Sequence, residues 1–151
     1  DPLWSRGLGD VYKRQALDRI VNFFPEERRE QLLMDLSLNL RAMISQRLLP
    51  KEGGQGRVAA LEVMLNTPLI SDLIAKGDVV EIKEIMKKSR ELGMQTFDQS
   101  LLDLYESGAV MYEDALRNAD SVNDLRLQIK LHSKRAHNTD LAAGTEHFRI
   151  L

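Results

Sequence analysis

The sequence predicts a mostly helical fold with one small β-hairpin. Apolar residues recur at helical spacing over most of the chain, helix-capping residues punctuate it at regular intervals, and only one segment alternates around a glycine-rich turn. Aromatic residues make up 5% of the 151 residues and charged residues 29%, which is typical of a helix-rich globular chain rather than an aromatic-rich β protein. A chain of this length has room for about one domain of ordinary size.

Charge and cysteine content exclude several classes of protein. The 21 basic and 23 acidic residues give a net charge of −2, which offers no strong field for nucleic acid or anionic lipid. The chain contains no cysteine, which excludes disulfide scaffolds and thiol chemistry. No apolar run has the length of a membrane span. We therefore expect a cytoplasmic protein without a nucleic-acid partner.

The first fifteen residues, 1–15, do not share the pattern of the rest. They hold the single tryptophan and two of the nine glycines, and they show neither helical nor strand periodicity. Residues 8–15 resemble translated adapter sequence at the end of an assembled open reading frame. We interpret 1–15 as a non-native or disordered segment, with a natural flexible arm as the alternative. The regular pattern begins at Ala16.

The first elements are two helices and a hairpin. Residues 16–24 read as the end of a helix that Pro25 stops, and acidic residues then open a long second helix. Its apolar stripe is wide, which predicts burial on more than one side. We expect strands at 46–49 and 57–65 around the glycines of 53–56. The stripe assigned to the second helix comprises Leu32, Leu33, Leu36, Leu40, Met43 and Ile44.

The remaining elements are helices marked by their caps. Thr67 and Pro68 open a helix that Gly77 closes, and Asp78 with Glu81 opens another that we expect to end at Gly93. A helix from Phe97 closes at Gly108, a short one covers 112–119, and Ser121 with Asp124 caps the last. The apolar period fades after Lys134. Residues 137–151 are therefore expected to form a tail with a short strand at 147–151.

No active site follows from the residues themselves. A phosphate-binding loop needs G-x-x-x-x-G-K-[ST], and the chain contains no Gly-Lys pair. The glycines of 53–56 favour a hairpin turn over a phosphate loop. The spacing of His132, His137 and His147 matches no metal-ligand pattern, so surface histidines are the better interpretation. From these patterns we expect no catalytic, cofactor-binding or metal-binding residue, and a non-enzymatic helical interaction module would be the default.

Basic residues cluster towards the last helix. Acidic neighbours dilute the cluster and no aromatic residues interleave with it, so a solvated face is favoured over a lipid or nucleic-acid site. The cluster comprises Arg117, Arg126, Lys130, Lys134 and Arg135.

Several segments resemble the secretion and pilus-retraction ATPases of type II and type IV machineries, in the expected order along the chain. They are ALDRIVNFFP at 16–25, SQRLLP at 45–50, GRVAALEVMLNTP at 56–68 and ELGMQTFDQSL at 91–101. The part beyond residue 119, with GTEHFRIL at 144–151, is more similar to the PilU branch than to the PilT branch. The chain is thereby identified as resembling the C-terminal part of a PilT/PilU-type retraction ATPase.

The resemblance implies the end of a RecA-like α/β P-loop ATPase core at 16–65 and a helical C-terminal subdomain at 66–136. The full-length protein would bind ATP and Mg, form a hexamer with itself or a paralogous retraction ATPase, and drive pilus retraction and twitching motility. It would work in the cytoplasm, peripheral to the inner-membrane pilus base and its platform protein. The family's nucleotide motifs precede this stretch, so the chain alone is expected to show no ATPase activity and to need no cofactor.

The resemblance also supplies candidate site residues. A short family helix, AIRNLIRE, supports retraction, and residues 69–76 occupy its place with Ile70, Leu73 and Ile74 kept. Both arginines of the family helix are replaced, which favours a packing role over a charge-mediated one. We favour packing of this helix into the C-terminal subdomain over direct contact with a partner. Gly56, Arg57 and Glu62 match the family's G-R-x-x-x-x-E. The resemblance makes Arg57 and Glu62 candidates for interaction or motor coupling, and it implies a nucleotide-side or subunit-interface role for Arg57. A stand-alone helical adaptor remains the alternative for the whole chain.

Overall fold

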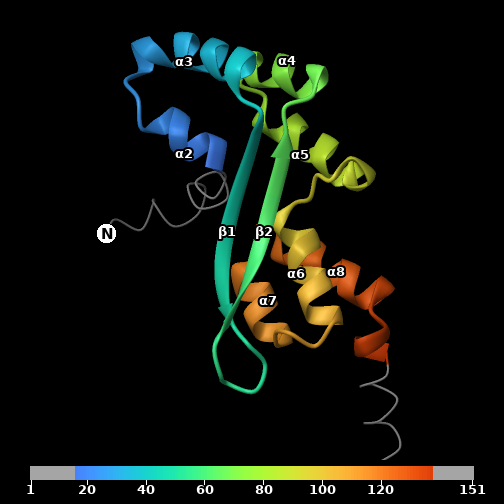
Figure 1. Cartoon of the computed structure of the whole chain (residues 1–151). Helices are drawn as coiled ribbons and strands as arrows, with labels where there is room; N and C mark the ends of the chain where they lie inside the picture. The colour runs from blue at the N-terminus through green and yellow to red at the C-terminus, as the bar shows by residue number, and fades with distance from the viewer. Residues whose placement is uncertain (1–15, 138–151) are drawn as a thin grey trace, which may run out of the picture. The chain divides into compact units, whose positions relative to one another are not determined.

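The computed structural model describes residues 16–137 as helices around a single β-hairpin (Figure 1). The segments predicted at 1–15 and 147–151, and all but the first residue of the predicted tail, lie outside the described residues. No described helix is long and apolar enough to cross a bilayer. In chain order the elements are α2 (Ala16–Asn22), α3 (Glu26–Asn39), β1 (Ala42–Pro50), β2 (Arg57–Leu65), α4 (Pro68–Lys76), α5 (Val79–Lys88), the 3₁₀ turn η2 (Arg90–Leu92), α6 (Phe97–Glu106), α7 (Tyr112–Asn118) and α8 (Val122–His132).

The described residues form two compact units, which are taken separately below. The first unit contains 16–46 and Leu61–Phe97, and the second contains Arg47–Ala60 and 98–137. A division into two compact units does not show where an ATPase core would end and a C-terminal subdomain would begin. The predicted division at 65/66 therefore stays a prediction.

The predicted hairpin is present, and its second strand has the predicted bounds. Three glycines of the turn have positive φ: Gly53 at 96°, Gly54 at 80° and Gly56 at 81°. Such values are costly for residues with a Cβ, so these glycines shape the turn. The turn is closed by the Lys51 N–H, which donates to the Gly56 carbonyl at 3.1 Å. This geometry supports the turn interpretation of the glycine cluster.

The first strand begins four residues earlier than predicted, because Met43 and Ile44 belong to β1 and not to the second helix. Burial alternates along β1, with odd-numbered residues turned inwards. The side-chain amide of Asn66 donates to the carbonyls of Ser37 and Leu40 at 3.0 and 2.8 Å. These bonds satisfy the open carbonyls at the end of α3, which stops the helix at Asn39.

The N-terminal caps predicted from the sequence are present in α4, α5 and α8. The Thr67 hydroxyl accepts from the Ile70 N–H, and Asp78 and Ser121 accept from the N–H three residues on. The α5 boundary was predicted wrongly: the helix ends at Lys88, and only the 3₁₀ turn η2 reaches Gly93. The reason is Ser89, whose hydroxyl donates to the Ile85 carbonyl at 2.7 Å as the backbone leaves the helix.

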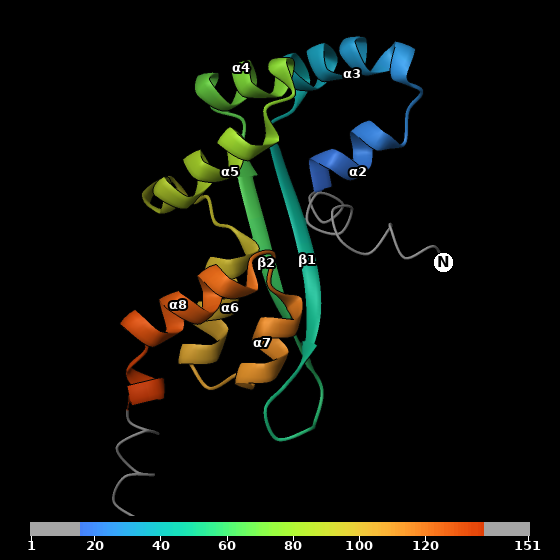
Figure 2. The ribbon, with the colours of Figure 1, turned by 180° about the vertical axis from the view of Figure 1, so that it is seen from behind.

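Each unit has its own buried core. In the first unit, α3 and α4 lie side by side at one end of the hairpin, and apolar residues from α2, β2, α4 and α5 meet beneath them (Figures 1 and 2). In the second unit, α6, α7 and α8 gather beside the turn end of the hairpin (Figure 2). The first core includes Leu17, Met64, Ile70, Ile74, Ile82 and Met86, and the second includes Leu49, Ala60, Leu101, Val110, Leu125 and Ile129.

Candidate motor-coupling site

Helix α4 carries three of the candidate residues, and the structure places all three inside the first unit. Ile70 and Ile74 are 0% exposed, and Leu73 is 8% exposed. They lie on one side of the helix because residues three and four apart share a face. On this evidence they hold α4 against the core rather than presenting a surface. A role of these three residues in motor coupling stays a prediction. They would exert it by fixing the position of α4.

The attachment of α4 to α3 is polar as well as apolar. The Ser71 hydroxyl donates to the Ser37 carbonyl of α3 at 2.7 Å. At the other end, Gly77 has φ of 69°, and a Cβ there would lie 3.3 Å from Cδ1 of Leu33. Serine at 71 replaces an arginine of the family helix and makes this contact. The outward face of α4 presents Leu69, Asp72 and Lys76 to solvent.

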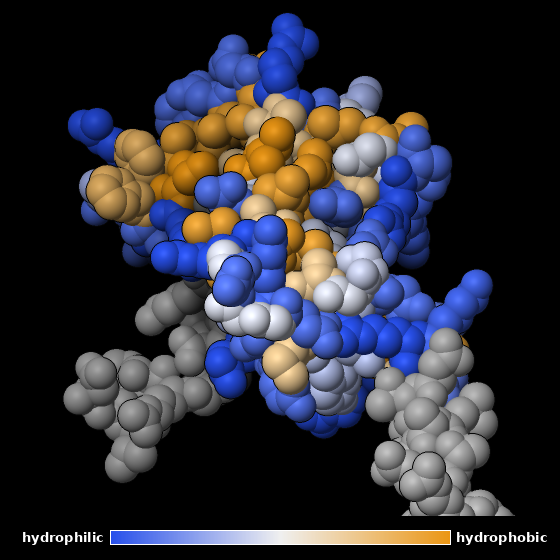
Figure 3. All heavy atoms as spheres, turned by 60° about the horizontal axis from the view of Figure 1, so that its bottom comes forward, coloured by the Kyte–Doolittle hydropathy of each residue, from blue (hydrophilic) through white to orange (hydrophobic). Residues whose placement is uncertain are grey.

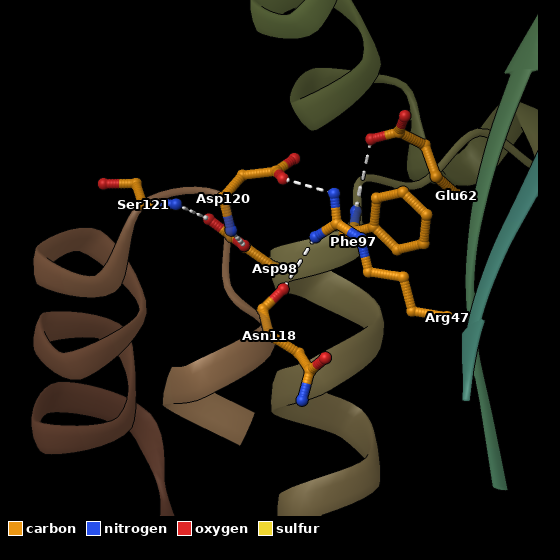
Figure 4. Close-up of polar contacts among 7 residues, drawn as sticks. All are labelled: Arg47, Glu62, Phe97, Asp98, Asn118, Asp120 and Ser121. Atoms are coloured by element: carbon orange, nitrogen blue, oxygen red, sulfur yellow. Dashed lines mark hydrogen bonds and ion pairs between the residues drawn. The ribbon is translucent and has the colours of Figure 1, made fainter. Parts of the chain in front are cut away.

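Glu62 is a buried carboxylate on β2 in the first unit. It is 8% exposed, and its Oε2 accepts from the Phe97 backbone N–H at 3.4 Å (Figure 4). Phe97 is the first residue of α6, so the carboxylate faces a helix N-terminus, where negative charge is favoured. A small pocket beside Glu62 is lined mainly by apolar side chains from α2, β1, β2 and α5, with Ser45 as a second polar residue.

Arg57 lies in the second unit, at the exposed start of β2 after the positive-φ Gly56. The structure thus places Arg57 and Glu62 in different surroundings, one solvated and one buried. The hydrogen bond to the N-terminus of α6 is by itself a sufficient reason for an acidic residue at position 62. A nucleotide-side or subunit-interface role for Arg57 stays a prediction, and so does a motor-coupling role for Glu62.

A polar cluster in the second unit was missed by the sequence analysis. The Arg47 guanidinium, on β1, donates to the Asn118 carbonyl at 2.6 Å and to Oδ1 of Asp120 at 2.8 Å (Figure 4). The Asp98 carboxylate of α6 accepts from the backbone N–H groups of Asp120 and Ser121 at 2.8 and 3.1 Å. We call these five residues the Arg47 cluster. It ties the strand, α6 and the α7–α8 connection together.

A second set of contacts fixes the end of α8. The Arg135 guanidinium donates to the carbonyls of Tyr105 and Val110 at 2.7 and 3.0 Å and pairs with Glu52. It also lies 4.5 Å from the centre of the Tyr105 ring, within cation–π range. Glu106 accepts from the Ser133 hydroxyl and the following N–H groups, and the Ser133 bond is the main reason that the pKa of Glu106 is lowered from 4.5.

These contacts hold the backbone and the side chains of the second unit in position. Within residues 16–137 there is no group of three carboxylate, histidine or cysteine side chains that could hold a metal ion. The charged groups of the Arg47 cluster are occupied with one another and with backbone. Figure 3 shows apolar residues gathered over the upper part of the face in view. The exposed large apolar residues of the first unit include Phe23, Met34 and Leu38.

The fold is similar to part of solved ATPase structures. A solved structure of the pilus retraction motor PilT with bound ADP superposes with a TM-score of 0.61 and 36% identity, over 73% of this chain and 30% of that one. The Yersinia pseudotuberculosis ATPase DotB superposes with a TM-score of 0.52 and 25% identity, over 67% of this chain and 26% of that one. No family model matches the chain.

Curated relatives specify the family. The chain is 60% identical to the type IV pilus ATPase PilU of Pseudomonas aeruginosa over 120 residues, 80% of this chain and 31% of that protein. It is 39% identical to PilT of the same organism over 105 residues, 70% of this chain and 30% of that protein. These identities support a PilT/PilU-type fragment that is more similar to this PilU than to this PilT. It spans about a third of the length of these relatives.

Proposed function

We propose that the chain is the C-terminal part of a PilU-type pilus retraction ATPase that transmits movement rather than performing the chemistry. The observation that carries the proposal is the 60% identity to PilU over 120 residues, in a chain without a Gly-Lys pair. In the complete protein, ATP with Mg would bind at motifs outside this stretch. Its hydrolysis would move the two units as rigid bodies, which is a common form of conformational change in motors.

The buried positions of the α4 residues fit such a transmitting part. A rigid element passes on a displacement only if its side chains do not yield, and close-packed cores have that property. Helix α4 is held by a capped N-terminus, a left-handed C-terminus and the serine bond to α3. From the similarity to PilU we propose two kinds of partner for the complete protein. They are other ATPase subunits in a hexamer, and a platform protein at the cytoplasmic side of the inner-membrane pilus base.

A chimera tests the proposal. The segment of Pseudomonas aeruginosa PilU that matches this chain is replaced by residues 16–137, and twitching is measured in a strain that lacks its own PilU. We expect twitching zones close to those of the unmodified protein. The matched control carries Ile74→Asp, which places a charge in the core and should abolish the activity. A chimera that accumulates, hydrolyses ATP and gives no twitching would contradict the proposal.

A second measurement concerns nucleotide. The isolated chain should show no ATP binding by titration calorimetry, because it lacks the lysine and the N–H cradle that hold phosphates. Micromolar ATP binding by this chain would be incompatible with the proposed division of labour. Genomic sequence upstream of Ala16 provides a further check, since the proposal requires a G-x-x-x-x-G-K-[ST] motif there, and its absence would favour the stand-alone adaptor.

A further inference from the structure

Helix α8 presents an outer face with two different columns of side chains. Leu125 and Ile129 point into the second unit, and the opposite side carries Leu127 and Leu131, which are 51% and 58% exposed. Arg126 and Lys130 lie next to the leucines at the same four-residue spacing, and both are exposed.

The charges of this face are not used inside the described structure. Among residues 16–137, neither Arg126 nor Lys130 makes an ion pair, whereas the nearby Arg117 and Arg135 do. Asp124 lies at the start of the helix, where its own N–H is bonded to the Ser121 cap. The α8 face therefore combines two leucines with two unpaired cations, a composition suited to an anionic amphipathic partner.

Helix α3, in the first unit, has an outer face of the opposite sign. Met34 and Leu38 are 47% and 73% exposed, and their spacing continues towards the N-terminus to Glu30 and Glu27, which are exposed too. The inner side of α3 is the one that packs on α4. The α3 face thus consists of two carboxylates followed by two apolar side chains along one stripe.

We propose that the α3 face of one copy of this chain docks on the α8 face of a second copy. Each face has two exposed apolar residues at four-residue spacing and two charges, and the charges are of opposite sign. Pairing would cover Met34 and Leu38 with Leu127 and Leu131 and bring the carboxylates to the cations. A contact between two different surfaces of identical chains is heterologous, the kind of contact from which rings and filaments are built.

A lipid surface is a weaker fit to the same observations. Two leucines and two cations are a small apolar and basic patch compared with the faces of helices that bind membranes. A lipid partner would also leave the acidic α3 face unexplained, whereas a second copy explains both faces together. The inference deepens the proposed function by naming one contact between subunits, but its test requires neither nucleotide nor pilus.

Disulfide trapping is well suited to this chain because it contains no cysteine. A Met34→Cys chain and a tagged Leu131→Cys chain are mixed in equal amounts under mild oxidation, and products are separated by mass. We expect at least about five-fold more heterodimer than either homodimer, because a single helix pair is small but selective in orientation. A Val80→Cys chain, altered at an exposed position on α5, is the matched control for random collisions.

Charge reversal and salt test the electrostatic part. Glu30→Lys in the first chain or Lys130→Glu in the second should each lower trapping about two- to five-fold, in the range of surface ion pairs. Combining the two reversals should restore it, and raising salt from about 0.01 M to 1 M should weaken it by screening. Circular dichroism checks that each variant is folded.

Two results would overturn the proposal. One is a yield of disulfide-linked heterodimer that is no higher than with the Val80→Cys control, or a yield that changes neither with the charge reversals nor with salt. The other is binding of the full chain to phosphatidylglycerol vesicles that is lost in Leu127→Ser, since the α8 face would then belong to a lipid surface. Neither result bears on the PilU chimera, so the two proposals fail independently.

Discussion

Replacing Arg47 with methionine removes the cation of the Arg47 cluster while keeping a long apolar side chain. The Asp120 carboxylate, 10% exposed, would lose its 2.8 Å partner, and the Asn118 carbonyl would lose its 2.6 Å donor. Breaking a buried ion pair by removing one partner costs about 3–5 kcal/mol. Because the Arg47 side chain is 18% exposed and water can partly replace it, we expect a loss of about 2–3 kcal/mol.

The edge-on pair of Tyr105 and Tyr112, 6.0 Å apart in the second unit, gives a near-ultraviolet circular dichroism signal for the assay. Urea unfolding followed by this signal should show the loss, and the melting temperature should fall by roughly 4–12 °C. Arg117→Met is the matched control, because Arg117 is 74% exposed and pairs with Asp114 at 3.4 Å. That change should cost less than about 0.5 kcal/mol.

A double-mutant cycle with Asp120→Asn isolates the pair. We expect a coupling free energy of about 1–3 kcal/mol between positions 47 and 120, as for contacting residues in one network. If Arg47→Met costs no more than Arg117→Met, or if the cycle gives no coupling, the cluster does not hold the second unit together and its role as a rigid tie is refuted.

Three further predictions concern α4 and the end of α8. Ile74→Ala should destabilise the first unit by about 2–5 kcal/mol in urea unfolding, while Val80→Ala on the surface should change stability by less than about 0.5 kcal/mol; equal effects would contradict the core assignment. Gly77→Ala should cost about 1–2 kcal/mol in the same measurement, since alanine is strained at φ of 69° and its Cβ would crowd Leu33. The pKa of Glu106 is lowered from 4.5, so its contribution to stability is present above about 4.5 and is lost as pH falls through the lower folded value. Hydrogen exchange, corrected for intrinsic pH dependence, should therefore accelerate in residues 133–137 below that pH, and Glu106→Gln should remove the step.

Local signals in the sequence predicted the helices that carry their own stop and start residues. Thr67, Pro68 and Gly77 gave both ends of α4, because each acts through bonds within a few residues of itself. The β2 bounds were predicted for a similar reason, since the glycine turn fixes where the strand begins. The resemblance to pilus ATPases was carried by the same continuous segments.

Boundaries set by distant residues were predicted wrongly. Met43 and Ile44 fit a helical stripe as well as a strand, and the sequence between Asn39 and Ala42 contains no strong helix breaker. The end of α3 is set instead by Asn66, whose amide binds carbonyls 26 and 29 residues earlier in the chain. A periodicity argument considers one window at a time and has no access to such a bond.

The Arg47 cluster could not be predicted from the sequence for the same reason, because its contacts join residues that are far apart in the chain. Arg47 and Asp120 are 73 residues apart, and nothing in the sequence distinguishes this pair among 21 basic and 23 acidic residues. Glu62 was selected from a family pattern, and in the structure its carboxylate accepts a hydrogen bond from the first N–H of α6. A motor-coupling role for Glu62 would have to be compatible with this helix-capping bond. A variant that separates the two is Glu62→Gln. Its amide oxygen can still accept from the Phe97 N–H, so the helix cap should survive. An effect of this variant on twitching in the PilU chimera would then report on the loss of the carboxylate.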